Sequence, residues 1–366
     1  MRIRSVTLHL LKLPLAEPYH VSYRVYEDFD PILVEAEGAD GCIGWGEGHI
    51  SPGYSNETVE GGFAFCRDLA GRIAGMDIAE AKVLVQSRKA ESPVAASGLI
   101  CALETLEDHP LLTLERDVAL PLLTPFHATA PEDIPREVER RLREGFTTLK
   151  VKVGKDWRAD LERVARVRDS AAGRAVIRLD ANRGFSRDDG LRFAEGLEPT
   201  GIELFEQPCA AKDWDANAAV AAASPVPVML DESIYGLEDI ERAGALPGVG
   251  FVKLKIKKMG GLDDLRAGLR RIRALGMEPV LGDGVAADIG CWMEACVARL
   301  GTDGGITNAG EFNGFLKTRA TLLENPMAFE SGALRLAAGY HPRIDRAALA
   351  RHRRVEWQAV SPRAAV

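Results

Sequence analysis

The sequence predicts an α/β protein in which a (β/α)8 TIM-type barrel carries an α+β capping domain. From Ala119 onward, short β-branched runs alternate with amphipathic helical stretches, and eight such runs follow one another at intervals of about 25 residues. The first 118 residues lack this rhythm, which indicates a separate cap. A chain of 366 residues is also long for one hydrophobic core, so we expect two domains.

The cap is expected to begin with an antiparallel meander. The segments 2–13, 31–37 and 42–47 alternate in hydrophobicity, and a turn at 38–41 joins the last two. Helical spacing follows over 55–74 and, broadly, 78–107. Cap loops at 18–30 and 50–58 are expected to form one wall of the functional site.

The barrel is expected to span residues 119–325, between a cap at 1–118 and a segment at 326–366 that returns to the cap. Two of its helices are predicted at 157–171 and 262–275. The eight predicted strands are 119–126, 147–153, 175–181, 202–208, 227–233, 251–256, 278–284 and 305–312.

Composition excludes several classes of protein. With 46% hydrophobic and 27% charged residues the chain resembles a soluble globular protein. A net charge of -8 argues against nucleic acid as a partner. We find no apolar run typical of a signal peptide or a membrane span, and no CxxC pair among the six cysteines, so we expect a cytoplasmic protein with reduced thiols.

Three acidic residues end consecutive predicted strands. Asp180 in IRLDAN, Glu206 in ELFEQP and Asp231 in VMLDES are separated by 26 and 25 residues, which is one strand-helix unit each time. Neighbouring strands lie roughly 4.8 Å apart, so the three carboxylates should converge and repel one another unless a cation neutralises them. All-oxygen ligation favours Mg²⁺ over zinc. A single acidic residue here would more simply cap the next helix.

Lysines are expected at the same barrel mouth. Lys150 and Lys152 in TTLKVKVG share one face of the second strand, and Lys255 in FVKLKIKKMGG lies on the sixth, roughly opposite. A lysine beside another lysine should have a depressed pKa, which would let it act as a base near neutral pH. Strand parity does not separate Lys255 from Lys253 and Lys257.

The motifs LKVKVG, LDAN, FEQP, LDES and LKIKKMGG, in this order and spacing, resemble the muconate-lactonizing-enzyme subgroup of the enolase superfamily. The resemblance implies Asp180, Glu206 and Asp231 as Mg²⁺ ligands. It implies Lys152 and Lys255 as acid/base groups on opposite faces of the substrate, with Lys150 supporting Lys152 electrostatically. It also implies that Asn182 and Glu232 lie behind the metal ligands.

This chemistry would remove the proton next to a carboxylate through an enolate. Reprotonation gives a racemase or epimerase of a small carboxylate, such as an amino-acid derivative; loss of a leaving group or cyclisation gives a lyase or cycloisomerase. A non-catalytic binding barrel is the third hypothesis. A histidine base at the seventh strand, as in mandelate racemase, is excluded because no histidine lies between the second and eighth strands.

Substrate contacts are predicted less specifically. The eighth strand ends in TNAGEFNGF, without the Asp-x-Asp that resembles the ammonium site of dipeptide epimerases, so a dipeptide is disfavoured. We also expect a homo-oligomer without membrane or nucleic-acid partners. The candidate contacts are Asp283, Glu311, Tyr26 and Tyr54, followed by Tyr19, His20, Arg24 and Asn56.

Overall fold

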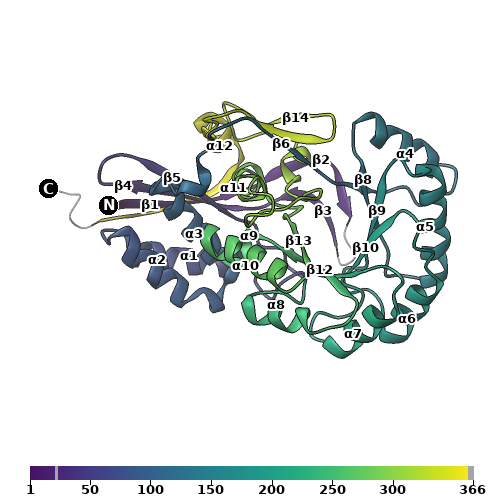
Figure 1. Ribbon diagram of the computed structural model, residues 1–366. Coiled ribbons are helices and arrows are strands. Elements are labelled where there is room, and N and C mark those ends of the chain that lie inside the picture. Colours follow the sequence, from purple (N-terminus) through teal and green to yellow (C-terminus); the bar gives the residue numbers. More distant parts are fainter. Residues whose placement is uncertain (21–23, 362–366) are drawn as a thin grey trace.

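The computed structural model describes residues 1–20 and 24–361. Its cap contains a four-stranded sheet in the order β16-β1-β4-β5, in which every strand pair is antiparallel. The C-terminal strand β16 lies beside the first strand of the chain (Figure 1). The four strands are β1 (Ile3–Leu11), β4 (Ile32–Gly38), β5 (Ile43–Gly48) and β16 (Arg353–Val360).

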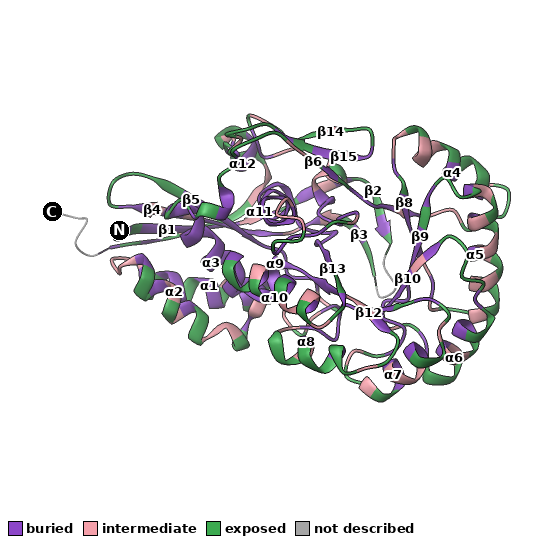
Figure 2. Ribbon diagram, in the orientation of Figure 1, coloured by how far each residue is buried: buried purple, intermediate pink, exposed green. Residues whose placement is uncertain are grey.

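Helix α3 (Pro93–Leu106) packs directly against β5, and its residues from Val94 onward are buried. Glycine allows this close approach, since a Cβ on Gly46 would lie 2.1 Å from the carbonyl oxygen of Gly98. Helices α1 (Val59–Ile73) and α2 (Ile78–Ser87) pack beside α3 with an exposed outer face (Figure 2).

The prediction of a loop over 18–30 is wrong in its described part. Strands β2 (Leu13–His20) and β3 (Val25–Phe29) form an antiparallel hairpin instead. Its register shifts between Pro14 and Tyr19, and this irregularity interrupts the alternation by which a strand is recognised in a sequence.

The barrel contains seven parallel strands in the order β13-β12-β11-β10-β9-β8-β7. Helices lie around the outside of this curved sheet (Figure 1). The strands are β7 (Thr124–Phe126), β8 (Thr148–Lys152), β9 (Val176–Asp180), β10 (Ile202–Glu206), β11 (Val228–Leu230), β12 (Val249–Leu254) and β13 (Glu278–Leu281). The helices are α4 (Ile134–Arg143), α5 (Trp157–Ala171), α6 (Arg187–Gly196), α7 (Trp214–Ala223), α8 (Leu237–Gly244), α9 (Ile256–Met259), α10 (Leu262–Ala274) and α11 (Asp288–Ala298).

The predicted eighth strand, 305–312, is not regular. A short segment closes the ring in its place: Glu311 N donates to Leu281 O at 2.9 Å, and Gly310 N donates to Pro121 O at 2.9 Å. The predicted first strand, 119–126, divides into β6 (Val118–Pro121) and β7. Pro121 and Pro125 lack the N–H groups that one continuous strand would require.

Strand β6 pairs with β15 (Ala333–Leu336), which in turn pairs with β14 (Ala328–Glu330). This small sheet joins residues on either side of the expected domain boundaries, so the division at 118 and 325 stays a prediction. In the ranges 1–20 and 24–361, none of the helices has the length and apolar character needed to cross a membrane.

Buried glutamates of the cap hold the N-termini of two barrel helices. Glu47 on β5 accepts hydrogen bonds from Ala287 N at 2.5 Å and Gly290 N at 3.1 Å, at the start of α11. Glu104 on α3 accepts from Leu262 N at 3.0 Å, at the start of α10. These bonds satisfy N–H groups that a helix leaves unpaired, and they fix the cap over the barrel mouth.

Candidate active site

Most of the predicted site residues meet at the C-terminal ends of the barrel strands, around a cavity of about 40 Å³. The cap contributes Tyr19, Ser51 and Tyr54 to its wall. The barrel contributes Lys150, Lys152, Asp180, Asn182, Asp231, Lys253, Lys255, Lys257, Asp283, Gly284, Val285 and Glu311.

The three carboxylates lie at the C-terminal ends of three adjacent strands. Asp180 pairs in register with Glu206, and Asp231 directly follows β11. All three side chains are buried. Lys150 Nζ lies 2.8 Å from both Asp180 Oδ2 and Glu206 Oε2. Burial, and then the neighbouring charge of Asp180, raise the pKa of Glu206. The expected convergence is therefore present, with lysines supplying positive charge.

Mg²⁺ fits this donor set by its chemistry. Over the described part of the chain, no group of three His, Cys, Asp or Glu side chains is close enough together to hold a metal ion as it stands. The three carboxylates are nevertheless buried hard oxygen donors, and Glu206 Oε2 lies 2.8 Å from the ammonium group of Lys150, so it already faces a positive charge. Such concentrated negative charge requires cations, and the ion pairs to the three carboxylates come from Lys150, Lys152, Lys253, Lys255 and Lys258.

Lys152 and Lys150 point to the same side of β8, as strand alternation predicts. Lys152 Nζ donates to Asp180 Oδ2 and to Asn182 Oδ1, each at 2.6 Å. Its side chain is 23% exposed, whereas that of Lys150 is 3% exposed. Lys152 is thus the member of the pair that incoming molecules can reach, while Lys150 is enclosed by Asp180, Glu206 and Glu311.

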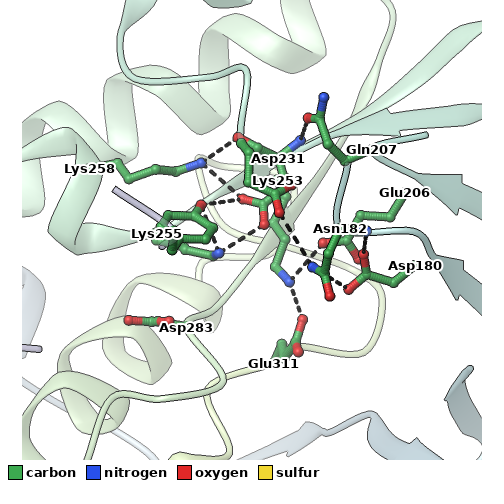
Figure 3. A network of polar contacts seen from close by, with 12 residues as sticks. Asp180, Asn182, Glu206, Gln207, Asp231, Lys253, Lys255, Lys258, Asp283 and Glu311 are labelled. Atoms are coloured by element: carbon green, nitrogen blue, oxygen red, sulfur yellow. Dashed lines mark hydrogen bonds and ion pairs between the residues drawn. The ribbon is translucent and has the colours of Figure 1, made fainter. Parts of the chain in front are cut away.

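Lys255 approaches the cavity from the end of β12. Its Nζ donates to Asp231 Oδ2 at 2.8 Å and to the Tyr54 hydroxyl at 2.9 Å. The Tyr54 hydroxyl donates to Asp231 Oδ1 at 2.9 Å. Figure 3 shows Lys255 and Lys258 directed at Asp231, while Lys253 points toward Glu311. The 50–58 loop of the cap therefore contributes to the site, as expected.

The expectation of depressed lysine pKa values is wrong for Lys150 and Lys255. Although burial opposes it, Asp180, Glu206 and Glu311 hold the pKa of Lys150 well above its ordinary value. Against the same effect of burial, Asp231 and Asp283 raise the pKa of Lys255. Contact with carboxylates outweighs the repulsion between lysines.

Of the remaining predicted residues, the fold places some at the site and others away from it. Asp283 forms an ion pair with Lys257 at 2.7 Å, and Glu311 contacts Lys150 at 2.8 Å. Glu232 accepts from Asn182 Nδ2 at 3.4 Å; burial and then the charge of Asp231 raise its pKa to about 7. The structure does not bring Tyr26 to the cavity, because β3 turns its ring into the core.

Lys258 and Gln207 contact Asp231 but had not been assigned roles from the sequence. Lys258 Nζ donates to the carbonyl and the Oδ1 of Asp231, at 2.7 and 2.9 Å. Gln207 Oε1 accepts from the backbone N of Asp231 at 2.9 Å and thereby holds the strand end. Lys258 lies on the short helix α9, where strand parity no longer applies. Gln207 follows Glu206 in FEQP, and adjacency to a candidate ligand was its only signal.

Comparison with known proteins gives a consistent result. A family model described as enolase C-terminal domain-like matches residues 133–340. The chain is 31% identical to the L-Lys-D/L-Arg epimerase of Methylococcus capsulatus over 73% of this chain and 78% of the relative. It is 25% identical to the N-succinyl-L-Arg/Lys racemase of Bacillus cereus over 72% of this chain and 74% of the relative.

The crystal structure of that Bacillus cereus racemase superposes with a TM-score of 0.89 at 23% identity, covering 98% of this chain and 100% of the other. The likeness supports the same architecture of barrel and cap. The family match extends over more than half of the 366 residues and contains all three acidic strand ends. The chain therefore belongs to the enolase superfamily, in the group that contains mandelate racemase and muconate lactonizing enzyme.

Proposed function

We propose that the protein is a Mg²⁺-dependent racemase or epimerase of an amino-acid derivative. One observation carries the proposal: Lys152 and Lys255 line one cavity from strands four positions apart in the curved sheet, and each contacts a different buried carboxylate. Two amines on opposite sides of one carbon permit removal of its proton from one face and return to the other.

Asp180, Glu206 and Asp231 would hold the Mg²⁺. When bound, the ion supplies positive charge against which a substrate carboxylate can accumulate negative charge. Asn182 supports this set from behind, since its backbone N donates to Asp180 Oδ1 at 2.9 Å. The carboxylate of Glu232 accepts a hydrogen bond from the side-chain amide of Asn182.

The lysines have distinct roles in this proposal. Lys152, the more exposed of the β8 pair, exchanges a proton with Cα on one face. Lys255 is held as an ammonium ion by Asp231 and Asp283, which is the form that returns a proton on the other face. Lys150 remains enclosed by carboxylates and contributes fixed positive charge.

The relatives support the reaction and the substrate class. Their names describe a racemase and an epimerase of Lys and Arg compounds. An amino-acid derivative with a free α-carboxylate satisfies both the names and the site, because only a carboxylate neighbour makes the α-proton removable by this arrangement of cations.

Incubation of the Mg²⁺-loaded protein in D₂O with N-acyl amino acids and dipeptides tests the proposal. We expect deuterium at Cα in both epimers, measured by NMR and mass spectrometry. An unsaturated or cyclised product would indicate a lyase or cycloisomerase instead. Absence of α-exchange in folded, Mg²⁺-loaded protein across the whole panel would contradict the proposal.

A further inference from the structure

Helix α11 carries an acidic side chain, Glu294, in the middle of an apolar and buried segment. Every residue of this helix is buried, and Glu294 itself is 0% exposed. Its side chain does not line the active cavity, so it cannot contact a substrate there. A buried carboxylate is costly unless hydrogen-bond donors surround it, so the partners of Glu294 require an explanation.

The two carboxylate oxygens of Glu294 each accept one hydrogen bond from the backbone. Oε1 accepts from Ile256 N at 3.0 Å, and Oε2 accepts from Asp283 N at 2.9 Å. Both donors belong to buried residues, so an apolar side chain in place of Glu294 would deprive two buried N–H groups of this partner. Glu294 therefore bridges two separate segments of the chain.

The two donors follow the ends of neighbouring strands. The pairing of β12 with β13 extends to Leu254 and Leu281, and Gly282 N still donates to Leu254 O at 3.1 Å. Beyond this point the strands separate, because the chain turns into α9 at Ile256. Glu294 continues the connection between the two strand ends through its side chain, directly after the backbone pairing stops.

The residues at these strand ends line the active cavity. Lys255, which precedes Ile256, and Asp283 itself both belong to its wall. Asp283 is the second carboxylate, after Asp231, whose charge acts on Lys255. The place of Lys255 relative to Asp283 thus depends on two backbone positions that a single buried carboxylate holds together.

The ionised form of Glu294 suits its two donors. Burial, and then the neighbouring charge of Asp283, raise the pKa of Glu294 to about 8, although the two backbone N–H groups oppose the shift. Above this pH the side chain offers one charged oxygen to each donor. A glutamine would offer one acceptor oxygen and point an amide N–H at the second donor. An aspartate would keep both oxygens on a side chain that is one methylene shorter.

We propose that Glu294 is a positioning residue of the active site, which holds the chain beside Lys255 at a fixed place relative to Asp283. The inference rests on the proposed function and deepens it, because it assigns the bridge to one half-reaction. Lys255 acts on one face of the α-carbon, whereas Lys152 acts on the other from β8, four strands away in the curved sheet. Release of the bridge should therefore slow proton transfer on the Lys255 face alone.

Exchange of the α-proton in D₂O, followed separately for each substrate epimer, tests this inference at about pH 9, where Glu294 is mainly ionised. K255A identifies the epimer that Lys255 serves, because this variant should lose exchange of that epimer. We expect E294Q to slow exchange of the same epimer by about 10-fold to 100-fold, the cost of a misplaced catalytic group, and to leave the other within about 3-fold. KM should change by less than about 3-fold, because Glu294 does not line the cavity.

Two matched variants separate positioning from charge and from general stability. E294D keeps the charge but is too short to reach both N–H groups, so it should show the same loss on the Lys255 face. E104Q removes another buried carboxylate that accepts from a backbone N–H, that of Leu262, and should leave the ratio of the two exchange rates within about 3-fold. Equal slowing of both epimers in E294Q would overturn the inference. Wild-type rates in E294D would also overturn it, because charge alone would then be sufficient.

A measurement without turnover distinguishes this inference from the proposed function. Hydrogen exchange of the backbone amides, followed by NMR or mass spectrometry, should be faster at Ile256 and Asp283 in E294Q than in the wild-type protein, and unchanged at both in E104Q. Equal protection of the two amides in E294Q and wild type would overturn the bridge. If both amides depend on Glu294 while the wild-type protein exchanges no α-proton, the reaction is wrong and the bridge between the strand ends stands.

Discussion

At the scale of single residues, the proposed acid/base groups Lys152 and Lys255 lie in different environments. Lys152 is partly exposed and contacts Asp180 and Asn182, whereas Lys255 is buried against Asp231 and Tyr54. Two unlike amines facing one carbon need not contribute equally to the reaction in its two directions. Each should serve the substrate epimer whose α-proton points toward it.

Replacing either lysine should therefore separate the two half-reactions. We expect K152A and K255A each to lose racemisation by about 10²-fold to 10⁴-fold, the usual contribution of a general acid or base. Each variant should still exchange the α-proton of the epimer that faces its remaining lysine, which NMR in D₂O would detect. K82M, which removes a surface lysine paired with Glu107, is the control. Loss of exchange for the same single epimer in both variants would contradict the two-sided arrangement.

At the scale of elements, helices and strand ends with a clear local sequence pattern were predictable. Helix α5 spans Trp157–Ala171, as predicted, because Asp156 caps it and its apolar spacing is regular. The acidic strand ends were likewise predictable, since one strand-helix unit separates each from the next. The hairpin β2–β3 was not, because a register shift conceals its alternation.

The parts that sequence reasoning missed depend on tertiary contacts. The ring closes through the hydrogen bonds of Gly310 and Glu311 and not through a regular strand. Lys258 reaches Asp231 because the chain turns into α9 directly after Lys255. No local pattern in the sequence encodes either contact.

Helix α3 is held to α10 by a buried carboxylate with an unusual titration. Burial raises the pKa of Glu104 from 4.5 to about 8, although hydrogen bonding from Leu262 N opposes the shift. The native state therefore binds this proton more tightly than the unfolded state does, so stability contributed by Glu104 is fully present below about pH 4.5 and is lost as the pH rises through 8.

The Glu104→Gln variant tests this titration. The free energy of unfolding of the wild-type protein, relative to E104Q, should fall between pH 5.5 and pH 8.5, as measured by urea denaturation at both values. E107Q changes a surface carboxylate at the C-terminal end of the same helix and should show no such trend. A pH-independent difference between wild type and E104Q would mean that Glu104 is ionised throughout this range.

At the scale of the whole molecule, the cap and the barrel form one site. The cap supplies Tyr19 and Tyr54 to the cavity. Its residues Glu47 and Glu104 accept hydrogen bonds from the N-termini of barrel helices. The barrel supplies the lysines and the carboxylates. Ligand binding at this junction should therefore stabilise both parts together, because neither alone contains the full set of contacts.

Addition of Mg²⁺ should raise the thermal midpoint of unfolding, and EDTA should reverse the change. At 100 times the dissociation constant, binding to the native state alone adds about 2.7 kcal/mol. The shift should disappear in D180N and persist in D303N, which alters a surface aspartate paired with Arg270. Differential scanning calorimetry measures the thermal midpoint of each variant with and without Mg²⁺. An equal shift in the two variants would place the ion elsewhere.

The pairing of β16 with β1 also has a consequence for how the protein is made. Gln358 donates to Thr7 across 351 positions of the chain. At ribosomal speeds of about 5 to 20 residues per second, roughly 20 to 70 s separate the synthesis of the two strands. During that interval β1 lacks its outer neighbour, and its unpaired backbone is open to strands from other nascent chains. Yield in cells should thus depend on chaperones that shield this edge until translation reaches β16.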